Sequence, residues 1–342
     1  MNRIAVLTGG GDVPGLNAAI RAVVRRAGEK GLEVTGVRDG WRGLLADDLV
    51  PLSRDAISGI LPKGGTILGT SRTNPLRDAD GIARIKATLA RRGIDAVVAI
   101  GGDDTLGAAC RLSREGVAVV GIPKTMDNDV RGTDVTIGFD TAVNAVMDAI
   151  DRLHSTTESH HRIMVVEVMG RDAGWVAAAG GLAGGADAVL VPEVPFDLEE
   201  VCAALRRRRA TGRRFSIVVV AEGAVPKDGA AQTVRDAPVD AFGHARLGGI
   251  GAVLAREIER RLEVETRATV LGHVQRGGSP SAFDRILATR FGVAAVDELV
   301  AGRTGVMVAL RGTTIVTTPL DDVIKGTRTL DPAIGALTRL FW

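Results

Sequence analysis

Ala96-Val97-Val98-Ala99-Ile100-Gly101-Gly102-Asp103-Asp104-Thr105 is the stretch that decides the fold, because an apolar run passes directly into a glycine-rich acidic loop. The pattern recurs where the apolar run 117–122 is followed by Pro123-Lys124-Thr125-Met126-Asp127-Asn128-Asp129. Short apolar runs of this kind are typical of buried parallel strands. Loops at the carboxyl ends of such strands line the ligand crevice of an open α/β sheet. The sequence therefore predicts four carboxylates and a lysine in one cleft, a set suited to phosphoryl transfer with a bound divalent metal.

Apolar runs and amphipathic segments alternate along the whole chain. This alternation predicts an α/β fold with mostly parallel sheets and helices on both faces. Predicted strands cover residues 4–7, 34–37, 96–100, 117–122, 163–168, 188–191, 217–221, 268–271 and 306–310. Predicted helices cover residues 15–29, 79–92, 105–115, 140–154, 174–181, 198–209, 248–263 and 283–300. Residues 223–247, rich in glycine, alanine, proline and aspartate, are predicted to be irregular.

The domain organisation has to be predicted without a linker, because no low-complexity segment divides the chain. The first lobe is predicted to combine residues 1–138 with about 275–325, and it carries the acidic loops. The second lobe is predicted to cover residues 139–274. Residues 326–342 are predicted to form a C-terminal tail.

Composition excludes several classes of protein. The 342 residues carry a formal net charge of +2, with 45% hydrophobic and 25% charged residues, so neither nucleic acid nor a membrane surface is an expected partner. Cys110 and Cys202 are too isolated for a disulfide framework. No apolar stretch approaches the roughly 18 residues of a membrane span, and no signal-peptide pattern opens the chain, so a cytoplasmic location is expected. The basic run 206–209 is predicted to be a solvated helix end rather than a binding patch.

Two glycine-rich stretches could bind phosphate. The first predicted strand ends in Gly9-Gly10-Gly11-Asp12-Val13-Pro14-Gly15, where backbone N–H groups and a helix N-terminus could approach an anion. Its spacing matches neither the dinucleotide fingerprint nor the Walker loop. A second stretch, 64–72, ends in Arg72, which suits bidentate phosphate contact. A purely structural turn remains the alternative for each stretch.

The acidic loops offer a metal ligand and a general base. Asp103 is the candidate Mg²⁺ ligand, since this ion takes one or two carboxylates together with substrate phosphates. A helix N-cap formed by Asp103 or Asp104 is the alternative. Asp127 and Asp129 are separated by one residue, so an extended loop would direct both toward one reacting centre, where a carboxylate can take a hydroxyl proton. A calcium loop lacks its later ligands here, while an Asx-turn with solvated acids remains open.

A second group of polar residues follows later apolar runs. It comprises Arg162, Met169-Gly170-Arg171, Glu222, Arg267 and Gly272-His273-Val274-Gln275-Arg276-Gly277-Gly278. Most of these residues lie at the ends of predicted strands. Arginines and a histidine so placed predict a second anion pocket, separate from the first.

The motifs together resemble the bacterial 6-phosphofructokinase family over nearly the whole chain. Family motifs appear in the family's order: Gly-Gly-Asp near the start, then segments 64–72, 125–129, 169–171 and 272–278. The resemblance implies a two-lobed phosphofructokinase-like fold. It also implies fructose 6-phosphate as the acceptor and Mg²⁺ as the cofactor.

The resemblance assigns roles residue by residue. Asp127 would be the base at the C1 hydroxyl with Asp129 beside it, Arg171 would steady the transferring phosphoryl group, and Asp103 would hold Mg²⁺. The donor would be bound by Gly11, Arg72, Gly102, Asp104 and Lys124. The sugar would be contacted by Thr125, which also belongs to the catalytic set, and by Met169, Gly170, Arg171 and Glu222. The 6-phosphate would be bound by Arg162, Arg267, His273 and Arg276. Because Arg162 and Arg267 come from a neighbouring subunit in this family, a homodimer or homotetramer with shared active sites is implied.

Donor choice depends mainly on Asp104. ATP-using members of the family generally have glycine at this position, which leaves room for the α-phosphate. Two like charges about 4 Å apart at an effective dielectric near 20 repel by roughly 4 kcal/mol, enough to change the preferred donor. Pyrophosphate has no α-phosphate to meet Asp104, and Lys124 could hold one of its oxygens. Trp41 falls where the family's adenine-side aromatic lies, which favours the opposite choice.

The predicted activity is therefore reversible, pyrophosphate-dependent phosphorylation of fructose 6-phosphate to fructose 1,6-bisphosphate. The first alternative is an ATP-dependent 6-phosphofructokinase with the same sugar site. A non-catalytic sugar-phosphate or nucleotide sensor has no need of the base Asp127. A lipid or NAD kinase shares a Gly-Gly-Asp loop but does not explain residues 162–171 and 267–278.

Overall fold

The computed structural model describes residues 1–227, 248–340 and 342, which form two compact units. The first unit contains residues 1–140 and 276–327, and the second contains residues 141–227, 248–275 and the C-terminal residues from 328 onward. Most of segment 223–247, predicted to be irregular, lies outside the described residues. The C-terminal residues form a helix, α11, that packs in the second unit on α6 and β7 rather than a free tail.

The first unit is built on a seven-stranded sheet of order β11-β10-β5-β4-β1-β2-β3. Its strands are β1 (Arg3–Thr8), β2 (Glu33–Val37), β3 (Leu49–Pro51), β4 (Ala96–Gly101), β5 (Val119–Pro123), β10 (Val306–Arg311) and β11 (Thr314–Pro319). All pairings are parallel except those of the outermost strands β3 and β11. After β2 the chain returns to the other side of β1 to add β4, so strand order reverses between β1 and β4.

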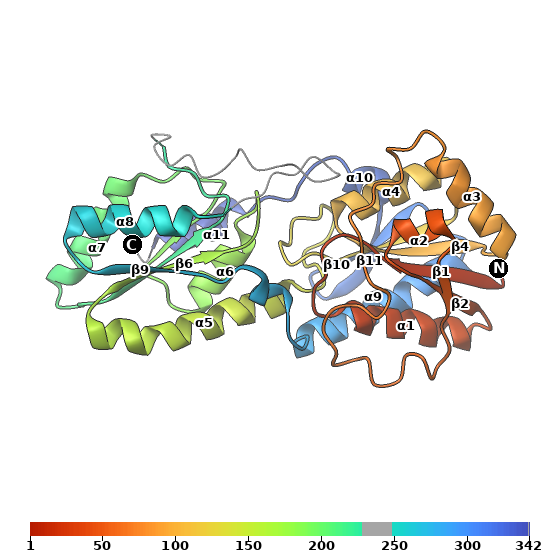
Figure 1. Ribbon diagram of the computed structural model, residues 1–342, viewed down its shortest axis with the longest axis horizontal. Helices are drawn as coiled ribbons and strands as arrows, with labels where there is room; N and C mark the ends of the chain where they lie inside the picture. Colours follow the sequence, from red (N-terminus) through yellow and green to blue (C-terminus); the bar gives the residue numbers. More distant parts are fainter. Residues whose placement is uncertain (228–247, 341) are drawn as a thin grey trace. The chain divides into compact units, whose positions relative to one another are not determined.

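Helices cover both faces of this sheet (Figure 1). They are α1 (Leu16–Glu29), α2 (Trp41–Ala46), α3 (Gly81–Arg92), α4 (Asp103–Arg114), α9 (Ala282–Val300) and α10 (Leu320–Val323). Helices α1 and α9 pack on one another on one face. On the other face, apolar residues of α2, α3, α4 and α10 form one core with the strands.

The second unit has a four-stranded, wholly parallel sheet of order β7-β8-β6-β9. Its strands are β6 (Ile163–Val168), β7 (Ala188–Leu190), β8 (Ser216–Ala221) and β9 (Thr266–Val270). Strand order reverses between β6 and β9, and β9 leads into the short 3₁₀ helix η1 (Gly272–Arg276). The helices are α5 (Phe139–His160), α6 (Trp175–Ala183), α7 (Leu198–Ala210), α8 (Ile250–Leu262) and α11 (Pro332–Arg339).

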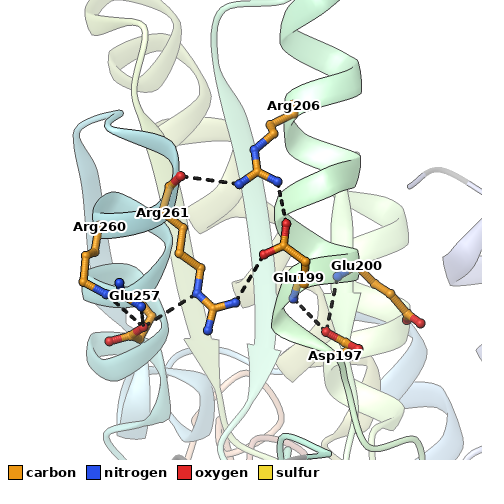
Figure 2. Close-up of polar contacts among 7 residues, drawn as sticks. All are labelled: Asp197, Glu199, Glu200, Arg206, Glu257, Arg260 and Arg261. Atoms are coloured by element: carbon orange, nitrogen blue, oxygen red, sulfur yellow. Dashed lines mark hydrogen bonds and ion pairs between the residues drawn. The ribbon is translucent and has the colours of Figure 1, made fainter.

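Helices α7 and α8 share an apolar core with the sheet and are joined at their surface by ion pairs. Figure 2 shows Glu199 of α7 accepting from Arg206 of the same helix and from Arg261 of α8, while Glu257 pairs with Arg260 and Arg261. Within the basic run 206–209, Arg208 pairs with Asp187, and Arg209 donates to the carbonyl of Arg214. These bonds join the end of α7 to neighbouring segments of the second unit.

The predicted α/β class, with mostly parallel sheets and helices on both faces, is confirmed. Most predicted strands and helices appear within a few residues of the predicted bounds. The edge strands β3 and β11 and the helices α2, α10 and α11 are absent from the sequence prediction. No helix among the described residues is long and apolar enough to cross a membrane.

The contact between α9 and α1 supports the first unit and can be tested by substitution. Phe291 of α9 is fully buried, so Phe291→Ala should lower the free energy of unfolding by about 3–5 kcal/mol. Phe283, on the same helix, is 43% exposed, so Phe283→Ala should change it by only about 0.5 kcal/mol. Urea unfolding measures both values, and equal losses would contradict this packing.

Candidate active site

The glycine loop after β1 lies where the first sheet reverses its strand order. The loop is fixed by backbone bonds, with Gly9 N–H donating to the carbonyl of Ile100 and Gly10 N–H to that of Ser71. The ammonium of Lys124, just after β5, donates to the carbonyls of Gly9, at 3.0 Å, and Gly11. Lys124 is only 2% exposed, and it therefore anchors the loop.

Burial makes Lys124 easier to deprotonate. Its pKa is lowered to about 8 by burial and by the charge of Arg276, while nearby carboxylates, including Asp127 and Asp129, oppose the shift. Lys124 is thus a cation buried at some cost beneath the glycine loop, and a nearby anion would stabilise its charge.

The first turn of α4 carries the acidic pair Asp103 and Asp104. Gly102 is the N-cap residue, so neither aspartate caps the helix, and that alternative from the sequence is wrong. Burial raises the pKa of Asp103 to about 8, and repulsion from Asp129 and Asp104 adds to the effect. Oδ1 of Asp103 is buried and has no hydrogen-bond partner among the described residues.

These features fit a divalent cation. A cation at Oδ1 of Asp103 would satisfy a buried acceptor and neutralise the repulsion from Asp104 and Asp129. In the part of the chain that the structure describes, no three His, Cys, Asp or Glu side chains form a closed metal cage. Mg²⁺ does not need one, because it is commonly bound by one or two carboxylates plus substrate phosphates and water.

The acidic turn after β5 holds Asp127 in a buried position. The sequence predicted an extended loop here. Asn128 instead adopts a left-handed conformation with φ of 55°, so that prediction is wrong. The Asn128 carboxamide accepts from the Thr136 N–H at 3.0 Å and fixes the turn. Oδ2 of Asp127 accepts a weak bond from the Thr125 hydroxyl at 3.3 Å, while Oδ1 is buried without a partner in the described structure. Asp127 therefore presents one unused acceptor oxygen.

Arg276 belongs to the first unit, although the resemblance assigns it to the sugar phosphate. One of its guanidinium nitrogens donates to the carbonyl of Asp12 at 3.4 Å, and its charge lowers the pKa of Lys124. Arg276 is thus beside the glycine loop. Arg72, at the end of the second glycine-rich stretch, is exposed.

Trp41, the proposed partner of an adenine ring, lies in the hydrophobic core of the first unit. It begins α2 and is only 2% exposed. Its ring packs with the core that contains Leu7, Val37 and Leu44. A face so buried is not available for stacking on a nucleotide base.

In the second unit, the strand-order reversal brings together the loop after β6 and the turn after β9. Residues 169–174, named here the β6 loop, contain Met169, Gly170 and Arg171. The carboxylate of Glu222, directly after β8, accepts from the N–H groups of Gly170 and Arg171 at 3.4 and 3.2 Å. Glu222 therefore supports the backbone of Arg171.

The sequence places Gln275 beside His273 and Arg276 but assigns it no role of its own. Gln275 is fully buried, its Oε1 accepts from Met169 N–H at 3.3 Å, and its Nε2 donates to the Gly272 carbonyl at 3.0 Å. Gln275 thereby joins the β6 loop to η1, which carries the exposed His273. Its position in the Gly-His-x-Gln-Arg motif is the sequence feature that could have indicated this role.

Arg162 and Arg267 lie at the other end of the second sheet. Arg162 precedes β6 and pairs with Glu265 at 2.6 Å, and Arg267, near the start of β9, pairs with the same carboxylate at 2.6 Å. Because β6 and β9 run parallel, this is the opposite end from His273 and the β6 loop. The structure of one chain therefore does not bring Arg162, Arg267 and His273 into a single anion pocket.

The chain matches a known protein family and individual proteins over nearly its whole length. The family model described as Phosphofructokinase matches residues 3–299. The chain is 58% identical over 335 residues to "Pyrophosphate--fructose 6-phosphate 1-phosphotransferase" of Streptomyces coelicolor, covering 97% of each chain. It is 53% identical over 324 residues to "ATP-dependent 6-phosphofructokinase" of Corynebacterium efficiens, covering 94% of this chain and 93% of that one. The resemblance drawn from the motifs is confirmed.

A solved structure agrees with the two-lobed fold. The phosphofructokinase from Saccharomyces cerevisiae superposes with a TM-score of 0.83 at 33% identity over 100% of this chain. This chain spans 47% of the yeast chain, less than half its length.

The variant Asp103→Asn tests how much the buried carboxylate of Asp103 lowers the free energy of unfolding. From about pH 4 to pH 8 the folded protein keeps a proton on Asp103 that the unfolded chain has lost, so wild-type stability falls as pH rises. The neutral variant escapes this loss, so the difference in free energy of unfolding between variant and wild type should grow in favour of the variant by about 1–3 kcal/mol from pH 5 to pH 8.5.

Chemical denaturation across this pH range measures the difference. Mg²⁺ should narrow the gap at high pH by stabilising the wild type. Parallel stability curves for the two proteins, insensitive to Mg²⁺, would contradict the environment described for Asp103.

Proposed function

Since this chain belongs to the phosphofructokinase family, we propose that it transfers a phosphoryl group from pyrophosphate to the C1 hydroxyl of fructose 6-phosphate. The products are fructose 1,6-bisphosphate and inorganic phosphate. The observation that carries the choice of donor is Asp104, a second carboxylate in the first turn of α4 beside Asp103.

Asp127 acts as the general base. Its buried, unpartnered Oδ1 accepts the proton of the C1 hydroxyl as that oxygen bonds to phosphorus and the bridging P–O bond of pyrophosphate breaks. The Thr125 hydroxyl steadies the other carboxylate oxygen. Arg171 neutralises charge on the transferring group, and the chemistry is otherwise positioning, with no covalent enzyme intermediate.

A divalent cation, Mg²⁺, would be held by Asp103 with the phosphates of the donor. When bound, it supplies positive charge to the phosphate oxygens. The glycine loop would hold the rest of the donor through its backbone, anchored by Lys124.

Asp104 opposes a longer donor. A cavity of about 280 Å³ lies beside the two aspartates, lined also by Gly107, Ala108 and Ile324. A nucleoside triphosphate whose chain extended into this cavity would bring its α-phosphate against the Asp104 carboxylate, whereas pyrophosphate has no α-phosphate. The burial of Trp41 removes the feature that favoured a nucleotide.

The sugar phosphate is expected to require more than one subunit. Arg162 and Arg267 lie at the end of the second sheet remote from His273, so a partner subunit would supply these arginines to a complete site. A homodimer or homotetramer is therefore part of the proposal, and sedimentation velocity would measure its size.

The activity is tested by assaying purified protein with fructose 6-phosphate, Mg²⁺ and either donor. With pyrophosphate as donor the reaction should run in both directions, because phosphoryl transfer from pyrophosphate to fructose 6-phosphate lies nearer equilibrium than transfer from ATP. The ATP-dependent alternative has support from the Corynebacterium efficiens relative. Efficient use of ATP together with no activity on pyrophosphate would refute the proposal in favour of this alternative.

Asp104→Gly should move the preference toward ATP. Removing both the bulk and the charge beside the donor is expected to raise kcat/KM for ATP by at least about tenfold, equivalent to about 1.4 kcal/mol. Asp104→Asn is the matched control, because it keeps the bulk and removes only the charge. If Asp104→Gly leaves the ratio of kcat/KM for the two donors unchanged, Asp104 does not select the donor.

A further inference from the structure

The β6 loop is held by side chains from three other parts of the second unit. Gln275 accepts from the N–H of Met169, and Glu222 accepts from those of Gly170 and Arg171. At the end of the loop, Glu193 accepts from the N–H of Gly174. The backbone on either side of Arg171 is thus fixed by side-chain acceptors from outside the loop.

The need for this support lies in the backbone of Arg171, which has a φ of 50°. A left-handed conformation is unfavourable for a long side chain, and it persists only where the surroundings enforce it. Gly223 lets its backbone approach Arg171 closely, because a Cβ there would lie 2.0 Å from the carbonyl oxygen of Arg171. Loss of support would therefore let Arg171 relax away from this conformation.

Of the three supporting side chains, Glu193 contacts the loop residue that lies farthest along the chain from Arg171. Its Oε1 accepts from Gly174 N–H at 2.9 Å and from Leu330 N–H at 2.8 Å, while Oε2 lies 3.1 Å from the same Gly174 nitrogen. Gly174 is the N-cap residue of α6, where a negative charge is favourable. A Cβ on Gly174 would lie 2.5 Å from the Cβ of Val191 and 2.7 Å from Oε2 of Glu193, so glycine fits this position.

Through Leu330, Glu193 also contacts the C-terminal segment. Trp175, the first residue of α6, donates from its indole nitrogen to the Arg328 carbonyl at 3.2 Å. The Arg328 guanidinium lies 3.9 Å from the centre of the Trp175 ring. Leu330 is 5% exposed. Residues 328–330 are thus packed against the start of α6.

We infer that Glu193 is a positioning residue for Arg171, and that it does this by tying the β6 loop to the segment 328–330. This inference rests on the proposed function, in which Arg171 contacts the transferring phosphoryl group. Glu193 acts through Gly174, and the C-terminal segment is thereby a working part of the active-site scaffold.

Glu193→Ala removes both hydrogen bonds of Oε1. Misplacement of Arg171 should lower kcat by about 10- to 100-fold, and the KM for fructose 6-phosphate should rise by a smaller factor, because Met169 and Gly170 lie in the same loop. Glu193→Gln retains a carbonyl oxygen that can accept from both Gly174 and Leu330, so its kcat should stay within about threefold of wild type. Failure of Glu193→Gln to restore kcat would overturn the inference.

Asp197→Ala is the matched control. Asp197 caps α7 in the same unit, accepting from the N–H groups of Glu199 and Glu200 at 2.8 and 3.4 Å. Both alanine variants remove an acidic acceptor at a helix N-terminus and should lower the melting temperature by about 2–4 °C. Only Glu193→Ala should lower kcat. An equal fall of kcat in Asp197→Ala would show a general loss of stability instead.

Amide hydrogen exchange tests the positioning role independently of activity. Amides of residues 170–174 should exchange at least about tenfold faster in Glu193→Ala and at the wild-type rate in Asp197→Ala. Unchanged exchange in Glu193→Ala would overturn the inference. If wild-type protein turned over neither donor, the proposed function would fail, while the exchange result would still decide what Glu193 does.

Discussion

When a chain adds parallel strands first on one side of its starting strand and then on the other, the connecting helices cover opposite faces of the sheet. The carboxyl ends at that reversal stay open to ligands. Both units are organised in this way, between β1 and β4 in the first and between β6 and β9 in the second. The glycine loop and the acidic turns occupy one reversal, and the β6 loop with η1 occupies the other. The chemistry of the protein follows from this constraint on topology.

Each reversal holds groups that are unfavourable before substrate arrives. Asp103 keeps an unsatisfied oxygen and a raised pKa, Lys124 has a lowered pKa, and Arg171 has a left-handed backbone. These costs are of different kinds, namely desolvation, like-charge repulsion and backbone strain. Carbonyls of the glycine loop hold Lys124, and the Glu222 carboxylate holds the backbone of Arg171, so these two groups are fixed before the reaction.

The sequence located Gly101–Asp104 and Pro123–Asp129 at the carboxyl ends of β4 and β5, because an apolar run marks each strand, but it did not predict the left-handed turn at Asn128. It was insufficient for β3 and β11, which are outermost strands with little buried alternation. It could not show that the Lys124 ammonium donates to carbonyls of a loop more than a hundred residues earlier in the chain. It gave no signal for Glu193, which belongs to no motif and acts only through contacts that folding creates.

The residues assigned to the donor and those of the β6 loop belong to different units of the fold. Substitutions in the first turn of α4 can therefore change which phosphate compound is consumed without disturbing the scaffold around Arg171. Such a division favours evolutionary exchange of the energy source within one lineage. The coexistence of relatives named for pyrophosphate and for ATP, at 58% and 53% identity to the same chain, is the pattern that this modular inheritance would produce.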